Sequence, residues 1–336
     1  MTPTSLAKFL QAFFTEYLPM QRNVSPHTVR SYRDVMTLLL RFCRDRKGLA
    51  IERLRVDQLS AELVIEFLDS LEADRGCSIR TRNQRLAALH AFMRYLQVEA
   101  PEHMLHCQRL LAIPFKRYDR PALHYLSAEQ MRAVLSQPDL RTPIGRRDLA
   151  LLSVLYDTGA RVQEVIDLTV RDLRIDSPAQ LRLRGKGGKT RVVPLLPNTV
   201  ALLADHLREH GLDQPHHLAS PVFVNRNQQR LTRMGIWRLL QKYATRARLA
   251  CPHLPEQISP HIFRHSKAMH LLQAGIPLVI IRDFLGHADI TTSEIYARAD
   301  LDMKRRALEK IAIPPAPRSF PSWQDDSALL TWLRAL

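Results

Sequence analysis

Apolar residues recur at intervals of three and four through the first hundred residues, in four separate runs. This interval places side chains on one face of an α-helix, so each run predicts a helix with one buried face. The runs are Leu6 to Phe13, Val29 to Leu39, Leu63 to Leu71 and Leu86 to Leu96. Ser25-Pro26 and Ser60, which precede two of the runs, are typical helix starts. We therefore expect residues 1–112 to form a four-helix domain.

A segment with little periodicity follows and carries Pro114 and Pro121. We interpret residues 113–126 as a linker. Ser127 with Gln130 three positions later predicts a capping box, which opens a second and mainly helical domain over residues 127–312. Within it, residues 179–195 alternate in strand fashion on both sides of a Gly-Lys-Gly-Gly sequence and predict a β-hairpin. Residues 313–336 form a proline-rich spacer followed by an apolar segment.

The charge of the chain points to a polyanionic partner. The formal net charge is +16 over 336 residues, and basic residues outnumber acidic ones in both predicted domains. Basic side chains that neutralise phosphates favour nucleic acid, and we expect double-stranded DNA, although ribosome-associated proteins share such a charge. The four cysteines lie far apart without a CxxC pair, so neither a zinc module nor a disulfide framework is predicted. With neither a signal peptide nor a long apolar run, a cytoplasmic, nucleoid-associated protein is expected.

Residues suited to phosphate chemistry gather in the second domain. Ser259-Pro260 predicts a helix start that places His261 and Arg264 on one helical face, where both can reach the same phosphate. The helix N-terminus adds amide donors for an anion. Upstream, Arg161 follows a glycine turn and Lys186 lies at the predicted hairpin tip.

Downstream, a helix that begins after Pro277 should end at the sequence Leu-Gly-His, residues 285–287. Thr291 and Glu294 then form a capping-box pattern that starts a helix bearing Tyr296. We therefore expect His287 and Tyr296 to flank a short turn.

Five of these patterns together resemble the catalytic set of tyrosine recombinases of the phage integrase type. They are Thr-Gly-x-Arg-x-x-Glu (158–164), the Gly-Lys-Gly hairpin, His-x-x-Arg-His (261–265), Leu-Gly-His (285–287) and a tyrosine nine residues later. The resemblance covers residues 127–300 strongly and residues 5–100 by pattern only. It implies a mainly α fold, with a helical, SAM-like core-DNA-binding domain and a mixed, mostly α catalytic domain that contains a small β-sheet.

The resemblance also implies a role for each residue. Tyr296 is the nucleophile, Arg161 and Arg264 hold the phosphate, Lys186 is the general acid, and His261 and His287 support acid–base chemistry or hydrogen bonding. Glu164 is expected to hold an arginine or histidine rather than react. No cofactor or metal is expected.

The chemistry of strand cleavage independently requires groups of these kinds. A tyrosine hydroxyl with a pKa near ~10 needs a base or a strongly positive site before it can attack phosphorus. Arginine forks match the phosphate oxygens, and the departing 5′ oxygen needs a proton.

Other features receive plainer interpretations. Arg80, Arg82 and Arg85 predict either a DNA-facing surface, which we prefer, or a solvated helix face. His206 and His210 predict a solvated helix face rather than a metal site, because the His-Glu-x-x-His order is absent. The sequence Gly-Lys-Thr at 188–190 is not a P-loop, because its first glycine position holds Leu183 and a strand follows. His265 is expected to be a buried histidine without a catalytic role.

The predicted function is site-specific recombination through a 3′-phosphotyrosine intermediate, for integration, excision or transposition of a mobile element. A type IB topoisomerase and a catalytically silent DNA-binding regulator are the alternatives. Because the first helix begins near Ser5, we expect no additional arm-binding domain. The apolar tail should dock either on its own catalytic domain or on a neighbouring protomer within a homo-tetramer or a mixed recombinase tetramer on DNA.

Overall fold

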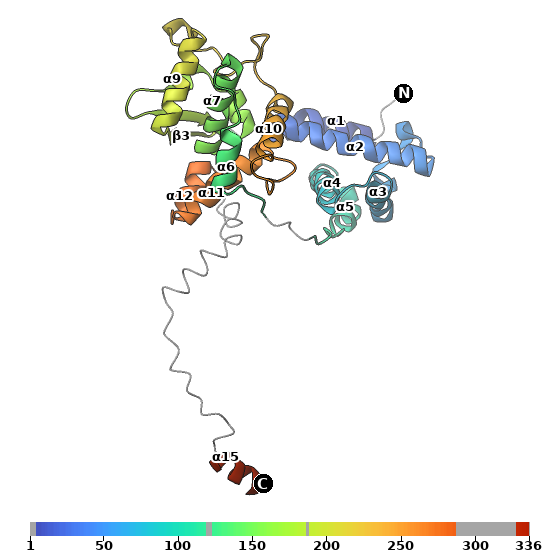
Figure 1. The fold of residues 1–336 in the computed structure, drawn as a ribbon. Coiled ribbons are helices and arrows are strands. Elements are labelled where there is room, and N and C mark those ends of the chain that lie inside the picture. The colour runs from blue at the N-terminus through green and yellow to red at the C-terminus, as the bar shows by residue number, and fades with distance from the viewer. Residues whose placement is uncertain (1–4, 119–122, 186–187, 287–326, 336) are drawn as a thin grey trace. The chain divides into compact units, whose positions relative to one another are not determined.

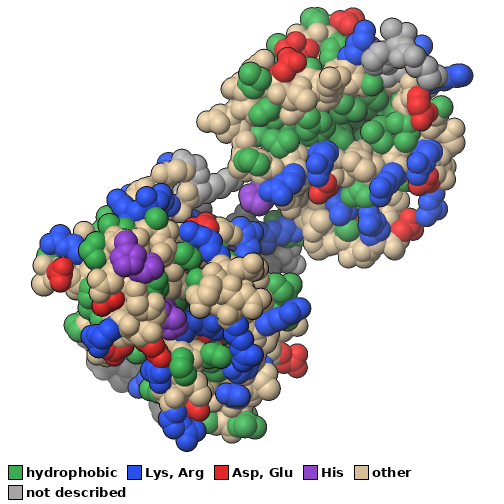
Figure 2. All heavy atoms as spheres, turned by 90° about the horizontal axis from the view of Figure 1, so that it is seen from above, with side chains coloured by type: hydrophobic (Ala, Val, Ile, Leu, Met, Phe, Trp, Pro, Cys, Tyr) green, Lys and Arg blue, Asp and Glu red, His purple; other side chains and the backbone are tan. Residues whose placement is uncertain are grey.

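The computed structural model describes residues 5–118, 123–185, 188–286 and 327–335 (Figure 1). The chain divides into two compact units, residues 1–121 and 122–336, each with its own hydrophobic core. Lys and Arg side chains appear on the surface of both units in the view of Figure 2.

Every regular element in the described part of the first unit is a helix. Its elements are α1 (Ser5–Ala12), the π-helix η1 (Phe13–Gln21), α2 (Pro26–Lys47), the short 3₁₀ turns η2 (Ile51–Arg53) and η3 (Val56–Gln58), α3 (Ala61–Ala73), α4 (Ile79–Glu99), the 3₁₀ turn η4 (Pro101–His103) and α5 (Met104–Leu111). The four predicted apolar runs lie in α1 with η1, in α2, in α3 and in α4. The sequence did not predict α5, because an eight-residue helix with two buried residues, Cys107 and Leu110, gives little periodicity.

Serine caps start the long helices of this unit as the sequence predicts. The hydroxyls of Ser25 and Ser60 accept the backbone N–H groups of Thr28 and Leu63 at 3.3 and 3.2 Å. Each cap satisfies a donor that has no partner inside the helix. The helices enclose a core that includes Phe13, Phe67 and Phe92.

Within its described residues the second unit is mainly helical and contains one small sheet. Its elements are α6 (Ala128–Leu135), α7 (Pro143–Asp157), α8 (Val162–Ile166), η5 (Val170–Asp172), β1 (Leu173–Arg174), β2 (Gln180–Arg184), β3 (Thr190–Pro194), α9 (Pro197–Glu209), η7 (Pro215–His217), α10 (Arg233–Ala247), α11 (Pro260–Gln273), α12 (Leu278–Leu285) and α15 (Ser327–Ala335). The mostly α fold with a small sheet is confirmed. Helix α7 contacts α6, α8, α9 and α11, and its residues 150–155 are buried.

The predicted hairpin is present as antiparallel strands β2 and β3, with Leu181 opposite Val193 and Leu183 opposite Arg191. Strand β1 pairs with β2 and completes a three-stranded sheet in the order β1-β2-β3. Only two residues long, β1 is too short to show an alternation in the sequence.

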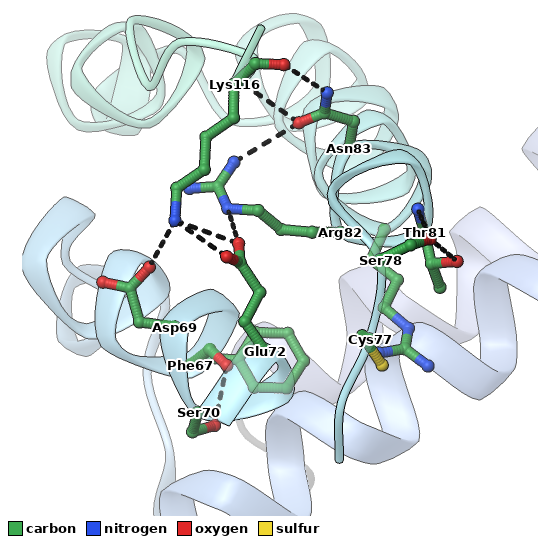
Figure 3. A network of polar contacts seen from close by, with 11 residues as sticks. Phe67, Asp69, Ser70, Glu72, Cys77, Ser78, Thr81, Arg82, Asn83 and Lys116 are labelled. Carbon is green, nitrogen blue, oxygen red and sulfur yellow. Dashed lines mark hydrogen bonds and ion pairs between the residues drawn. The ribbon is translucent and has the colours of Figure 1, made fainter. Parts of the chain in front are cut away.

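Both ends of the segment that we interpreted as a linker pack on the units. Ile113 belongs to the first core. The Asn83 side chain bonds the backbone of Lys116 twice, accepting its N–H at 3.1 Å and donating to its carbonyl at 2.8 Å (Figure 3). At the other end, Leu126 is fully buried and its N–H donates to Ser266 Oγ at 2.8 Å. The two ends of residues 113–126 therefore belong to the packed units.

The expectation of a solvated face for His206 is wrong. Its side chain is buried on α9, and Nε2 lies 2.8 Å from the carbonyl oxygen of Val222. Burial lowers the pKa of His206, so the ring is neutral at pH 7. Within the described ranges no cluster of His, Cys, Asp or Glu is placed to hold a metal ion. None of the helices described is long and apolar enough to cross a membrane.

Candidate active site

A glycine turn between α7 and α8 positions Arg161. Helix α7 ends at Asp157, and Gly159 adopts a left-handed φ of +55° before Arg161 caps the start of α8. A Cβ atom on Gly159 would lie 2.7 Å from Cδ2 of Leu285. Both the backbone angle and this close approach require glycine, which explains the Thr-Gly-x-Arg pattern.

Arg264 connects this turn to the end of α12. The side chain is buried in α11, three residues after His261. Its Nη1 donates to the carbonyl of Gly159 and its Nη2 to the carbonyl of Leu285, each at 2.6 Å. The guanidinium thus binds the segment before Arg161 and the segment before His287 at once.

Glu164 is the buried anion of the site. Its Oε2 accepts the backbone N–H of Arg161 and its Oε1 accepts Arg161 Nη1, both at 2.8 Å. The two Nη atoms of Arg191 donate to the same carboxylate at 2.9 and 2.8 Å. Burial by itself would raise the pKa of Glu164, but the hydrogen bonds and charges of Arg191 and Arg161 lower it overall. The carboxylate is therefore ionised at neutral pH and orients both arginines.

Arg191 is a site residue that we did not predict. It lies on β3 with 11% of its side chain exposed, and its Nε donates to the carbonyl of Phe284 at 3.0 Å. A Cβ on Gly286 would come within 2.9 Å of Arg191 Cδ, so the glycine leaves room for this side chain. The strand alternation around Arg191 could have indicated that its side chain is buried. Arg191 is two residues from buried Val193 and so lies on the same face of the strand, where a charged residue requires a buried partner.

His261 and His265 of α11 are neutral at pH 7. His261 lies in the first turn of α11, where desolvation of its ring and then the positive charges of Arg264 and Arg161 lower its pKa. Burial, aided by His261 and Arg264, lowers the pKa of His265 to about 4. The ring centroids lie 6.4 Å apart. Because the ring of His261 is neutral, one of its nitrogens keeps a free lone pair, while the two arginines disfavour its protonated form. His265 is half-buried rather than fully buried.

Lys186, His287 and Tyr296 lie outside the described residues, but the residues directly before two of them lie at the site. Gly185 precedes Lys186, and a Cβ built on it would be 3.4 Å from Glu164 Oε1 and 3.8 Å from Arg161 Nη1. Gly286 precedes His287, and its carbonyl accepts Arg161 Nη2 at 3.4 Å. The structure therefore brings Arg161, Glu164, His261 and Arg264 together with the chain positions that lead to Lys186 and His287.

The prediction that Arg82 faces DNA is wrong. Its side chain is 4% exposed, and Nε forms an ion pair with Glu72 of α3 at 3.0 Å (Figure 3). Lys116 Nζ donates to the same carboxylate at 3.0 Å, so Arg82 belongs to a structural network between α3 and α4. Arg80 is exposed, whereas Arg85 is half-buried and donates to the Cys77 sulfur at 2.9 Å.

Comparison with known proteins agrees with this geometry. The model of the phage integrase family matches residues 124–302, and that of the phage integrase N-terminal SAM-like domain matches residues 12–100. A Sinorhizobium fredii protein named integrase/recombinase y4rC is 39% identical over 99% of this chain and 98% of its own length. Tyrosine recombinase XerD of Listeria monocytogenes is 30% identical over 84% of this chain and 91% of its own.

A solved structure shares the fold. The Tn1549 transposon integrase in complex with transposon right end DNA superposes with a TM-score of 0.68 at 18% identity, covering 91% of this chain and 99% of that one. Because one family model spans more than half of the chain and a relative aligns over nearly all of it, this protein belongs to the phage integrase family of tyrosine recombinases.

Proposed function

We propose that this site-specific recombinase cuts a DNA strand with Tyr296, holds the 3′ end as a phosphotyrosine ester and rejoins it to a different strand. The observation that carries the proposal is the convergence of Arg161 and Arg264 with Gly185 and Gly286, the residues that lead directly to Lys186 and His287.

The described residues suit a phosphoryl-transfer transition state. Arg161 and Arg264 supply permanent positive charge where negative charge accumulates on the non-bridging oxygens. Both are positioned before DNA binds, Arg161 by Glu164 and Arg264 by two carbonyls. Such preorganised charge costs no rearrangement during the reaction.

In both cleavage and rejoining, one phosphate ester bond forms as another breaks. The Tyr296 oxygen attacks phosphorus and loses its proton, for which neutral His261 is a suitable acceptor, and His287 adds hydrogen bonding. The bond to the 5′ oxygen breaks, and Lys186 protonates that oxygen as it leaves. Rejoining reverses these steps with a 5′ hydroxyl of the second strand. One phosphate ester replaces another, so the exchange is close to energetically neutral and reversible.

Exposed basic residues on both units give candidate DNA contacts. Helix α10 carries exposed Trp237 and several exposed cations, and α4 presents Arg80 and Arg94. The exposed cations of α10 are Arg233, Arg238, Lys242 and Arg246. Phosphate contacts of this kind position a duplex without specifying its sequence. In this proposal residues 1–112 bind core DNA, residues 127–312 react, and the protein acts at the nucleoid in the cytoplasm.

The names of relatives support a mobile element as the substrate. The S. fredii relative is named as an integrase/recombinase, and the Tn1549 protein is a transposon integrase bound to a transposon end. A topoisomerase would share the chemistry, but the relatives named above are recombinases and integrases.

Trapping of the covalent intermediate tests the proposal. A library of nicked duplexes, in which the short cleaved fragment diffuses away, should accumulate a protein–DNA adduct on a subset of sequences. Joining of two separate duplexes at the recovered sequences would identify recombination, whereas relaxation of a single supercoiled circle without joining would identify a topoisomerase. Failure to trap any adduct across the library would contradict the proposed chemistry.

The role of Lys186 gives a chemical prediction. Lys186→Ala should slow cleavage by about 10²-fold to 10⁴-fold, the usual contribution of a general acid. A substrate with sulfur in place of the bridging 5′ oxygen should restore the rate, because a thiolate leaves without a proton. Rates are measured in single turnover on both substrates. Equal loss on the oxygen and sulfur substrates would place the acid elsewhere.

The C-terminal helix α15 carries an unusual surface for a helix of nine residues. Leu330, Trp332 and Leu333 are 41%, 59% and 52% exposed. An isolated helix this short is marginal in water, so its apolar side chains need a surface to pack on. We propose that the surface belongs to a neighbouring protomer, which links recombinases head to tail into a tetramer on two duplexes.

Ending the chain after Ile313 should leave folding and binding to one DNA site intact while assembly of the two-duplex complex weakens. The measurements are thermal melting, a gel-shift titration and the yield of the slow-migrating synaptic complex. The triple variant Leu330→Ser, Trp332→Ser, Leu333→Ser should behave like the truncation. Arg334→Gln on the same helix is the matched control and should assemble normally. Unchanged assembly, or unfolding of the truncated chain, would refute a role in trans.

A further inference from the structure

A largely buried ion pair joins α7 and α11 close in sequence to the two arginines of the site. Lys267 is three residues after Arg264 on α11, and Asp157 is the last residue of α7, four before Arg161. Lys267 Nζ is 3.8 Å from Asp157 Oδ1, and each side chain is 14% exposed. The pair therefore connects the helix that carries one arginine to the helix that leads into the other.

The stem of Lys267 lies against the glycine turn. A Cβ built on Gly159 would be 3.9 Å from Lys267 Cγ, and Lys267 Nζ is 4.9 Å from the centroid of the Tyr156 ring. The carbonyl of Gly159 is the acceptor of Arg264 Nη1. Lys267 and Asp157 thus lie beside the short turn whose Gly159 carbonyl binds Arg264 and which leads to Arg161 two residues later.

A further bond holds Asp157, and another joins the neighbouring Tyr156 to α11. Thr199, buried at the start of α9, donates its hydroxyl to Asp157 Oδ2, and the Tyr156 hydroxyl lies 2.8 Å from His270 Nδ1 on α11. Burial lowers the pKa of Lys267, and Asp157 opposes this shift. A buried charge that loses its partner is costly, so each member depends on the other. Neither hydrogen bonds to Glu164 or Arg191, and the pair is thus a second support for the arginines.

We infer that Asp157 and Lys267 are positioning residues for recombination: their ion pair fixes the Gly159 turn on α11 and thereby sets the separation of the Arg161 and Arg264 guanidinium groups. The alternative is a pair that only stabilises the fold. A positioning role predicts a loss of cleavage rate at saturating DNA, and a purely stabilising role predicts a lower melting temperature with an unchanged rate. Because Arg161 and Arg264 hold the phosphate only in the proposed function, the inference rests on that function.

The test uses the full chain with Asp157→Asn, Lys267→Met and the double variant. Single-turnover adduct formation is measured on a nicked duplex at saturating protein, together with the Kd for DNA and the melting temperature. Each single variant should lose about 10-fold to 100-fold in rate, the scale of a slightly misplaced reacting group, with the Kd changed less than about threefold. The double variant should be no slower than the slower single one, because the two side chains act through each other.

Tyr243→Phe is the matched control. Tyr243 is buried, and its hydroxyl donates to Asp148 Oδ2 at 2.7 Å between α10 and α7, away from the glycine turn. This variant should melt earlier and cleave at the wild-type rate. If Lys267→Met does not fold, Asp157→Asn decides the test, since it keeps the side-chain volume and an acceptor for Thr199.

Two results would overturn the inference. One is cleavage by both single variants at the wild-type rate below their melting temperatures, and the other is a double variant whose loss is the product of the single losses. Absence of an adduct with the wild-type protein would instead refute the proposed function, so the two failures are distinguishable.

Discussion

Replacing Tyr296 with phenylalanine should abolish the covalent adduct while DNA binding stays close to that of the wild type. The substitution removes one oxygen, the atom proposed to attack phosphorus, and leaves the aromatic ring. We expect the cleavage rate to fall by at least about 10³-fold, since loss of a covalent nucleophile has effects of this scale or larger. Denaturing gels that separate free from protein-linked DNA measure the adduct, and a gel-shift titration measures binding.

Tyr125→Phe is the matched control for this substitution. Tyr125 is half-buried in the same unit, and its hydroxyl accepts Gln273 Nε2 at 3.4 Å, a weak bond on the far end of α11 from His261. This variant should form the adduct at the wild-type rate. An adduct that persists in the Tyr296→Phe protein would show that another residue attacks phosphorus, and mapping the linked peptide would identify it.

Arg161→Lys should reduce cleavage by about 10²-fold to 10³-fold, the scale seen when one preorganised donor to a transition state is lost. The substitution keeps the positive charge but loses the planar guanidinium group with its several N–H donors. Arg161 binds Glu164 through Nη1 while Nη2 lies 3.4 Å from the Gly286 carbonyl, so the planar group spans several acceptors. A lysine side chain has a single ammonium group, which cannot bind Glu164 and the phosphate in the way that the planar guanidinium does. Single-turnover cleavage at saturating protein measures the loss.

Arg282→Lys on α12 is the control for an arginine outside the site. Arg282 pairs with its neighbour Asp283 at 2.8 Å and is one-third exposed, and surface pairs of this kind contribute little. Cleavage by this variant should match the wild type. If Arg161→Lys also cleaves at nearly the wild-type rate, the two-pronged contact with phosphate is not what Arg161 provides.

Local signals in the sequence predicted local structure well. Ser25, Ser60, Ser127 and Ser259 all cap helices where expected, because a cap depends on a hydroxyl and a donor three residues apart. The hairpin followed from its alternation and its glycines. In each case the residues that determine the element are its neighbours in the chain.

Errors arose where distant parts of the chain decide the outcome. Periodicity placed Arg82 on a helix face but could not show that Glu72 of α3 covers it. The same holds for His206, which is buried where its α9 face meets Val222. Arg191 was missed because its partner Glu164 is 27 residues earlier. The site residues themselves were named from five motifs in order, whereas their mutual contacts required the folded structure.

The long reach of the arginine contacts also bears on when the enzyme becomes active during its synthesis. Arg264 binds a carbonyl 105 residues earlier in the chain, and Arg161 binds one 125 residues later. Contacts of such sequence separation form late, because a long loop must close before they contribute. A nascent chain that has not yet emerged through α12 lacks the carbonyls of Leu285 and Gly286, whereas the first unit is already complete and free to fold. The first unit is therefore complete well before the contacts that orient Arg161 and Arg264 are able to form.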